Sequence, residues 1–91
     1  MTYRLVLHQA AADEIRSLPK TVKPRIRAAI DELAQAPVPR GASRLRGRAD
    51  AYRLRVGNYR IIYEVHATEV VVFIVGVAHR KEVYRRLLRR R

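Results

Sequence analysis

Three arginines in the segment YRLRVGNYRIIYEV, residues 52–65, have the chemistry and the spacing of an anion-binding site: Arg53, Arg55 and Arg60. A guanidinium group keeps its charge at any ordinary pH and offers five N–H donors in a planar fork that matches a phosphate group. It can therefore bind a phosphate and stabilise the negative charge that develops when a phosphoester bond breaks. Apolar and polar residues alternate on both sides of Gly57-Asn58, which predicts two antiparallel strands joined by a two-residue turn.

This predicted turn fixes how the two strands pair. With Gly57 first, we expect a type II′ turn that places Val56 opposite Tyr59 and Arg55 opposite Arg60. One face of the hairpin then carries the three arginines. The other face carries the core residues Tyr52, Leu54, Val56, Tyr59, Ile61, Tyr63 and Val65. Because directly opposed like charges destabilise a sheet, we favour an anion site over an idle, solvated face in an arginine-rich chain.

Few other side chains could do chemistry beside these arginines. The chain has no cysteine, its histidines His8, His66 and His79 show no metal-ligand spacing, and the polar face has no carboxylate pair, so we expect no metal and no cofactor. RNA can be cleaved without a metal, because its own 2′-OH is the nucleophile and the protein has to orient it and neutralise the phosphorane. Since guanidinium does not release a proton, His79 and Tyr84 remain as acid/base candidates. The alternatives are a spectator histidine in a basic turn and a tyrosine that packs in a helix.

The net charge of +12 indicates a polyanionic partner. Residues 40–60 and 79–91 each carry +6, whereas residues 1–39 carry +2 and residues 61–78 carry −2. Of the 20 cationic residues 17 are arginine. Phosphates neutralised by such residues release counterions, which favours binding to nucleic acid. An anionic membrane surface or an acidic protein would attract the same charge.

The rest of the chain contains elements that could support the hairpin. Alternation over residues 2–7 predicts a strand, and helical spacing of apolar residues over 11–18 and 22–33 predicts two helices, the second capped by Thr21 with Pro24 in its first turn. The two helices should form a hairpin that packs on the sheet.

The segments around the hairpin are expected to return the chain to it. Residues 36–50 are interpreted as a loop. The run 70–77 is apolar on both faces, which is typical of an interior strand, and its predicted register places Val75 opposite Arg60. A short amphipathic helix should follow near the C-terminus, with Val83, Leu87 and Leu88 on its apolar side.

Further basic residues flank the hairpin on both sides. We expect Arg80 to join the three arginines if the chain folds back there. The residues expected to extend a surface for RNA or the ribosome are Arg44, Arg46, Arg48, Lys81, Arg85 and Arg86.

The length and the apolar pattern predict one α+β domain over residues 1–91: an N-terminal strand and helical hairpin on a small, mainly antiparallel sheet, with a short C-terminal helix. No apolar run approaches the roughly 20 residues of a membrane helix, and the N-terminus lacks the apolar core of a signal peptide. We therefore expect a cytoplasmic protein that does not bind a membrane.

The fragments RLRG, YRLRVGNYRIIYEV and VVVFIVGVAHRKEVY, in this order and spacing, resemble the RelE toxins of type II toxin–antitoxin pairs, within the RelE/ParE superfamily. The resemblance covers nearly the whole chain. It implies the same α+β fold and ribosome-dependent cleavage of mRNA in the A site, with contacts to 16S rRNA. It also implies a hetero-oligomer with a cognate antitoxin that wraps the toxin and often displaces its C-terminal helix.

The resemblance also implies a catalytic set, namely Arg53, Arg55, Arg60, Arg80 and Tyr84. The chain departs from well-studied relatives in the first hairpin strand, where those proteins have lysines, one of them proposed as general base. Arginine cannot easily take that role. Either another group moves the proton, or the rate depends mainly on charge stabilisation and substrate alignment.

Two other readings remain open at this point. A ParE-like protein of the same fold would inhibit DNA gyrase by binding, although ParE relatives generally lack the full set of arginines and tyrosine. A non-catalytic RNA-binding module would need only the basic surface.

Overall fold

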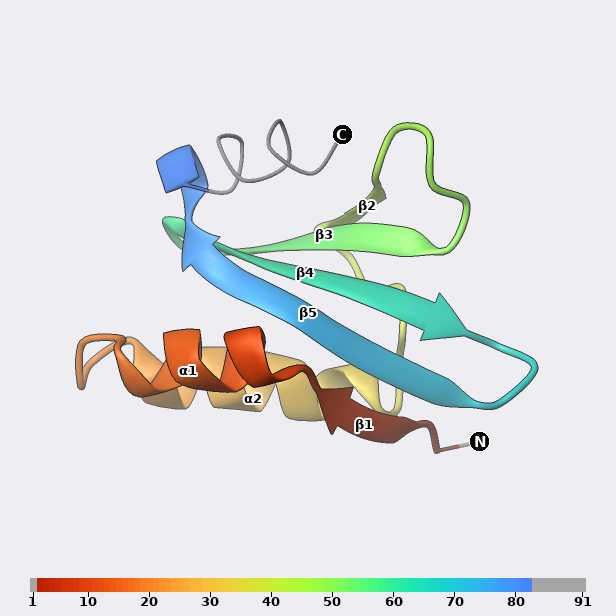
Figure 1. Ribbon diagram of the computed structural model, residues 1–91, viewed down its shortest axis with the longest axis horizontal. Helices are drawn as coiled ribbons and strands as arrows, with labels where there is room; N and C mark the ends of the chain where they lie inside the picture. The colour runs from red at the N-terminus through yellow and green to blue at the C-terminus, as the bar shows by residue number, and fades with distance from the viewer. Residues whose placement is uncertain (1, 83–91) are drawn as a thin grey trace.

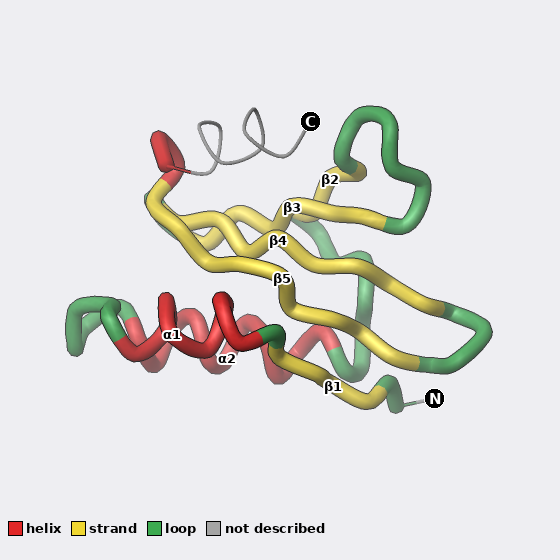
Figure 2. The backbone as a smooth tube through the Cα atoms, viewed as in Figure 1, coloured by secondary structure: helices red, strands yellow, loops and turns green. Residues whose placement is uncertain are grey.

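Two helices and five strands make up residues 2–82, the part of the chain that this computed structural model describes (Figure 1). The strands form one sheet in the order β1-β5-β4-β3-β2, and both helices cover the same face of it (Figure 2). This arrangement confirms the predicted α+β fold, a helical hairpin on a mainly antiparallel sheet. The elements are β1 (Arg4–Leu7), α1 (Gln9–Arg16), α2 (Lys23–Leu33), β2 (Ala42–Arg44), β3 (Ala51–Val56), β4 (Tyr59–His66) and β5 (Val71–His79).

The β3–β4 hairpin has the predicted register at every pair, including Arg55 opposite Arg60. Gly57 has a φ of +59°, and φ at Asn58 is not positive, as a type II′ turn requires. A Cβ atom on Gly57 would lie 3.3 Å from a guanidinium nitrogen of Arg25, which reaches the turn from α2. Backbone conformation and close packing therefore both favour glycine here.

Strand β5 is interior, as predicted, with β1 parallel on one side and β4 antiparallel on the other. Its predicted register with β4 is wrong, because Arg60 lies opposite Ala78 and not Val75. The connection between the strands is a loop over residues 67–70, and a β-bulge interrupts the pairing between Ile62 and Tyr63. The observed register brings the end of β5 beside the turn of the hairpin.

Helix α1 supplies a hydrogen-bond acceptor to the edge of β5 beyond the point where its pairing with β1 ends. The last pair between β1 and β5 is Leu7 with Ile74. Further along β5, Oε1 of Glu14 on α1 accepts a hydrogen bond from the backbone N–H of Val77 at 2.9 Å. A carboxylate thus takes the place of a strand for this edge N–H group.

Helix α2 supplies much of the core, although it begins differently from the prediction. Val22 and not Thr21 occupies the N-cap position, and no side chain caps this helix; the predicted place of Pro24 in the first turn is confirmed. One face of α2 is buried against the sheet. The core that the helices and sheet share contains Ala11, Ile26, Ile30, Leu33, Leu54, Ile61, Tyr63, Val72, Ile74 and Val77.

The connection between α2 and β3 contains a short edge strand, β2, which the sequence analysis assigned to a loop. It pairs antiparallel with residues 52–54. The start of this connection is fixed by Tyr63, whose hydroxyl donates a hydrogen bond of 2.7 Å to the Pro37 carbonyl. Burial, followed by the proximity of Tyr52, raises the pKa of the Tyr63 hydroxyl well above its usual value, so this donor stays protonated.

Residues 80–82 are helical, at the start of the predicted C-terminal helix. The rest of the predicted helix, including Val83, Leu87 and Leu88, lies outside the described residues. Neither helix in residues 2–82 is long and apolar enough to cross a membrane.

We expect Tyr63→Phe to lower the free energy of unfolding by about 1–3 kcal/mol, because the Pro37 carbonyl loses its donor in a buried setting. Urea denaturation at neutral pH measures this change. Tyr52→Phe is the matched control, since among residues 2–82 its hydroxyl makes only a 3.4 Å contact, with exposed Arg44. Equal destabilisation by the two variants would show that the Tyr63–Pro37 bond has no special role.

Candidate nucleic-acid interface

Arg53, Arg55 and Arg60 lie on the face of the sheet that turns away from the helices, which we call the arginine face. They come from the middle and end of β3 and the start of β4, on either side of the Gly57-Asn58 turn (Figure 1). Arg55 and Arg60 are directly opposed. The structure therefore confirms that the three predicted arginines share one face.

The three guanidinium groups differ in how they are held. Nη1 of Arg60 donates to the Gly57 carbonyl at 3.1 Å and to the Tyr59 carbonyl at 2.9 Å, which fixes this side chain against the turn. Nη2 of Arg53 has a long contact of 3.5 Å with Oγ of Ser43 on β2. Arg55 is exposed and forms no side-chain hydrogen bond or ion pair with any other residue among residues 2–82. It can therefore bind an incoming anion without breaking an interaction within that part of the chain.

The end of β5 brings Arg80 to the turn end of the arginine face. Its backbone N–H donates to the Asn58 carbonyl at 2.8 Å, so the start of the C-terminal helix is fastened to the hairpin turn. The side chains of Arg80 and Lys81 are both exposed. The backbone of Arg80 therefore lies beside the hairpin turn, and the grouping of its guanidinium with the hairpin arginines stays a prediction.

His79 is not brought to the arginine face. It is paired with Tyr59, whose side chain packs against the core, and the two rings are in edge contact at 5.6 Å between centroids. His79 therefore lies on the helix-covered side of the sheet, in a hollow lined also by Glu14, Leu18 and Glu82. The interpretation of His79 as an acid or base beside the arginines is corrected by this register, which places it on the opposite face.

Arg44 is also separated from the three arginines. It pairs with Tyr52, and its guanidinium carbon lies 5.8 Å from the centre of the Tyr52 ring, on the face opposite to Arg53. Arg46 is exposed in the loop between β2 and β3. Tyr84, Arg85 and Arg86 lie outside the described residues.

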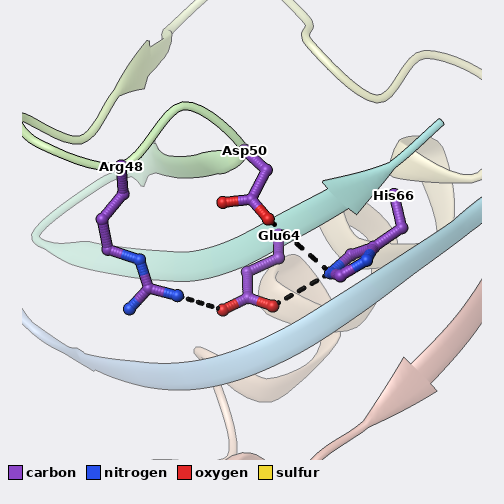
Figure 3. A network of polar contacts seen from close by, with 4 residues as sticks. All are labelled: Arg48, Asp50, Glu64 and His66. Atoms are coloured by element: carbon purple, nitrogen blue, oxygen red, sulfur yellow. Dashed lines mark hydrogen bonds and ion pairs between the residues drawn. The ribbon is translucent and has the colours of Figure 1, made fainter.

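Arg48 belongs to a polar network at the other end of the hairpin, which sequence reasoning did not find (Figure 3). Its Nη2 atom lies 2.6 Å from Oε2 of Glu64, and Oε1 of Glu64 lies 3.1 Å from Nε2 of His66. Oδ2 of Asp50 lies 3.9 Å from the same nitrogen of His66. The hydrogen bond to Glu64 is the main cause that raises the pKa of His66.

A signal for this network was present in the sequence. Glu64 and His66 are two residues apart on a strand and so share a face, and the hairpin register places Asp50 next to the partner of Glu64. Histidine spacing alone does not reveal this cluster, because two of its three members are carboxylates.

The geometry of the arginine face suits a phosphodiester. Arg55 and Arg60 are directly opposed, so two planar forks of N–H donors start from neighbouring positions on one face, and a bound phosphate would relieve the repulsion between them. The intramolecular contacts of Arg60 orient its guanidinium before any ligand binds. Among residues 2–82, His79 and Glu14 lie on the helix-covered side of the sheet. Asp50, Glu64 and His66 lie at the end of the hairpin far from the turn. Near the turn, the arginine face therefore supplies positive charge and alignment.

Several known proteins are similar to this chain. The family model of the ParE toxin of the type II toxin–antitoxin system parDE matches residues 5–84. The mRNA interferase toxin RelE of Escherichia coli (strain K12) is 35% identical over 94 residues, covering 99% of this chain and 98% of that protein.

Solved structures extend this similarity to three dimensions. The archaeal RelE–RelB complex from Pyrococcus horikoshii OT3 matches with a TM-score of 0.78 at 36% identity, over 88% of this chain and 97% of the solved one. The isolated E. coli RelE toxin matches with a TM-score of 0.75 at 32% identity, over 97% of each chain.

We expect Arg55→Gln to raise the free energy of unfolding by about 0.2–1 kcal/mol at low salt, because it removes the like-charge pair with Arg60. The gain should shrink as salt is added. Urea denaturation at two salt concentrations measures both effects. Arg40→Gln, at an exposed position before β2, is the control for net charge alone. If Arg55→Gln lowered the free energy of unfolding, or changed it no more than Arg40→Gln does, the opposed pair would not destabilise the sheet.

Proposed function

We propose that this chain, which belongs to the family of ParE and RelE toxins of type II toxin–antitoxin systems, is an endoribonuclease that cleaves messenger RNA on the ribosome. Its action arrests translation and growth. The observation that carries the proposal is the directly opposed pair Arg55 and Arg60 within a three-arginine face, in a chain 35% identical to an mRNA interferase toxin.

The proposed reaction uses the substrate's own nucleophile. The 2′-oxygen of a ribose attacks the adjacent phosphorus and its proton passes to water, while the bond from phosphorus to the 5′-oxygen breaks as that oxygen takes up a proton from the general acid. The products are a 2′,3′-cyclic phosphate and a 5′-hydroxyl end. Charge builds up on the non-bridging oxygens of the phosphorane between these steps, and preorganised donors there lower the barrier most.

In this proposal, Arg55 and Arg60 bind the non-bridging oxygens, and Arg53 and Arg80 hold the flanking phosphates. Arg60 is suited to its role because two backbone carbonyls already orient its guanidinium group. Arg55 is suited because its exposed side chain has no polar partner in residues 2–82. Such alignment of the 2′-oxygen with the phosphorus contributes much of the rate in reactions of this kind.

Proton transfer is the part of the mechanism that arginine cannot perform. His79 lies on the other face of the sheet, which removes it from this role. We assign the general acid to Tyr84, because its phenol can donate to the leaving 5′-oxygen. The cleavage rate then depends on charge stabilisation and substrate alignment more than on a strong general base.

The proposed partners follow from the charge of the chain and from its relatives. Relatives of this chain have been solved as RelE–RelB complexes, and we propose a hetero-oligomer with a cognate antitoxin here as well. With a net charge of +12, the chain should favour an acidic antitoxin segment. On the ribosome, 16S rRNA would meet the loop arginines Arg46 and Arg48, and Arg44 would contact it from the neighbouring edge of the sheet. The site of action is therefore the cytoplasm.

Inducing the chain in growing cells should produce mRNA breaks that lie within translated frames, which sequencing of mRNA 5′ ends measures. We expect Arg55→Gln and Arg60→Gln each to lower the cleavage rate by about 10²–10³-fold, the effect of removing one preorganised donor at a developing charge. His79→Gln is the matched control, because this residue lies on the opposite face, and it should stay within a few fold of the wild type.

The outcomes of this experiment separate the candidate activities. Breaks outside translated frames, or cleavage undiminished in Arg60→Gln, would contradict the proposed mechanism. Growth arrest without any breaks, together with loss of negative supercoiling in plasmid DNA, would indicate a gyrase inhibitor of the ParE kind. Binding to naked RNA with a steep salt dependence and no cleavage would indicate a non-catalytic module.

A further inference from the structure

Three potential metal ligands converge at the end of the hairpin far from the turn: Asp50, Glu64 and His66. Glu64 and His66 project from the same face of β4, and Asp50 immediately precedes β3. One nitrogen of the His66 ring faces a carboxylate oxygen from each of the other two residues, as Figure 3 shows. The proposed RNA-cleaving function does not use these three residues.

The spacing of these atoms is close to that of a tetrahedral site. Ligand atoms bound to Zn²⁺ at about 2.0–2.1 Å lie about 3.3 Å from one another in a tetrahedron. Nε2 of His66 lies 3.1 Å from Oε1 of Glu64 and 3.9 Å from Oδ2 of Asp50. All three atoms lie within 4.8 Å of one another. Small side-chain rotations would therefore bring them around one ion.

The surroundings orient two of the three ligands. Arg48 binds Oε2 of Glu64 and leaves Oε1 directed at His66, so the two oxygens have separate partners. The His66 ring is in edge contact with Phe73 at 4.8 Å between centroids. Contacts of this kind to the outer side of a ligand fix its direction and are part of a functional metal site.

We propose that Asp50, Glu64 and His66 form a binding site for a divalent cation of the Zn²⁺ type. The ligand set selects this class, because an imidazole nitrogen suits Zn²⁺ and its neighbours in the transition series, whereas Mg²⁺ and Ca²⁺ prefer oxygen ligands alone. Two carboxylates and one imidazole also neutralise the charge of the ion. The side chains leave a fourth position for water or for a partner's ligand.

The position of the site indicates what an ion would do there. It would join Asp50, at the end of the basic loop, to β4, and so fasten the loop that carries Arg46 and Arg48. Glu64 and Arg60 are four residues apart on the same face of one strand, about 13 Å at 3.3 Å per residue. The ion would therefore lie on the arginine face but outside the proposed cleavage site.

Titration calorimetry of the purified full-length chain with ZnCl₂, after removal of trace metal with a chelator, tests this proposal. We expect one ion per chain and a rise in the melting temperature with added Zn²⁺. His66→Asn and Asp50→Asn should each weaken binding at least tenfold. Addition of MgCl₂ in place of ZnCl₂ should give no comparable heat or shift.

The matched control is His8→Asn, because the His8 ring is likewise in edge contact with Phe73, at 5.8 Å between centroids. This variant loses the same kind of aromatic contact but no proposed ligand, so it should bind Zn²⁺ as the wild type does. Absence of Zn²⁺ binding, or binding that is unchanged in His66→Asn and Asp50→Asn, would overturn the site. The network would then be an ion-pair cluster that fastens the loop and nothing more.

Discussion

The pairing of β3 with β4 is the constraint on which the rest of the structure depends. Because side chains alternate along a strand, the Gly57-Asn58 turn decides in one step which residues enter the core and which face outward. A slip of one residue would bury the arginines and expose Leu54 and Ile61. The same turn that builds the core therefore also assembles the arginine face.

Other parts of the chain keep this hairpin in place. Interior strand β5 covers the free edge of β4, and Glu14 on α1 binds the edge of β5 that β1 leaves open. Arg25 packs against the turn from α2, and Arg60 binds the carbonyl groups around it. The turn is thus in contact with two guanidinium groups, one from α2 and one from β4. Some arginines of this basic chain therefore hold the hairpin that carries the other arginines.

The hairpin could be predicted in full from the sequence because its register is local. A two-residue turn with glycine first allows one register between the flanking strands, and the alternation of apolar residues agrees with that register. The register of β5 could not be predicted in the same way, since it depends on a four-residue loop with Val70 at positive φ and on a bulge in β5 at Val75. Neither has a clear signature in the residues. Strand β2 was missed because only its pairing with β3 identifies it.

The errors at the candidate site follow from these registers. Shifting β5 by three residues reverses the face of every side chain near its end, so His79 moved from the arginine face to the core side. Arg44 lies on the other face because β2 is a strand with its own alternation. The cluster of Asp50, Glu64 and His66 was within reach of the sequence, since the hairpin register alone brings Asp50 and Glu64 together.

The central claim is that the arginine face binds the phosphodiester that is cut. The most direct measurement is a structure of the chain on a ribosome whose A-site codon carries 2′-deoxyribose in place of the attacking 2′-OH, so that cleavage stops before bond formation. The account predicts non-bridging oxygens of that phosphate within hydrogen-bonding distance of the Arg55 and Arg60 guanidinium groups. A codon bound instead at the helix-covered face, with the arginine face in contact with rRNA alone, would contradict it.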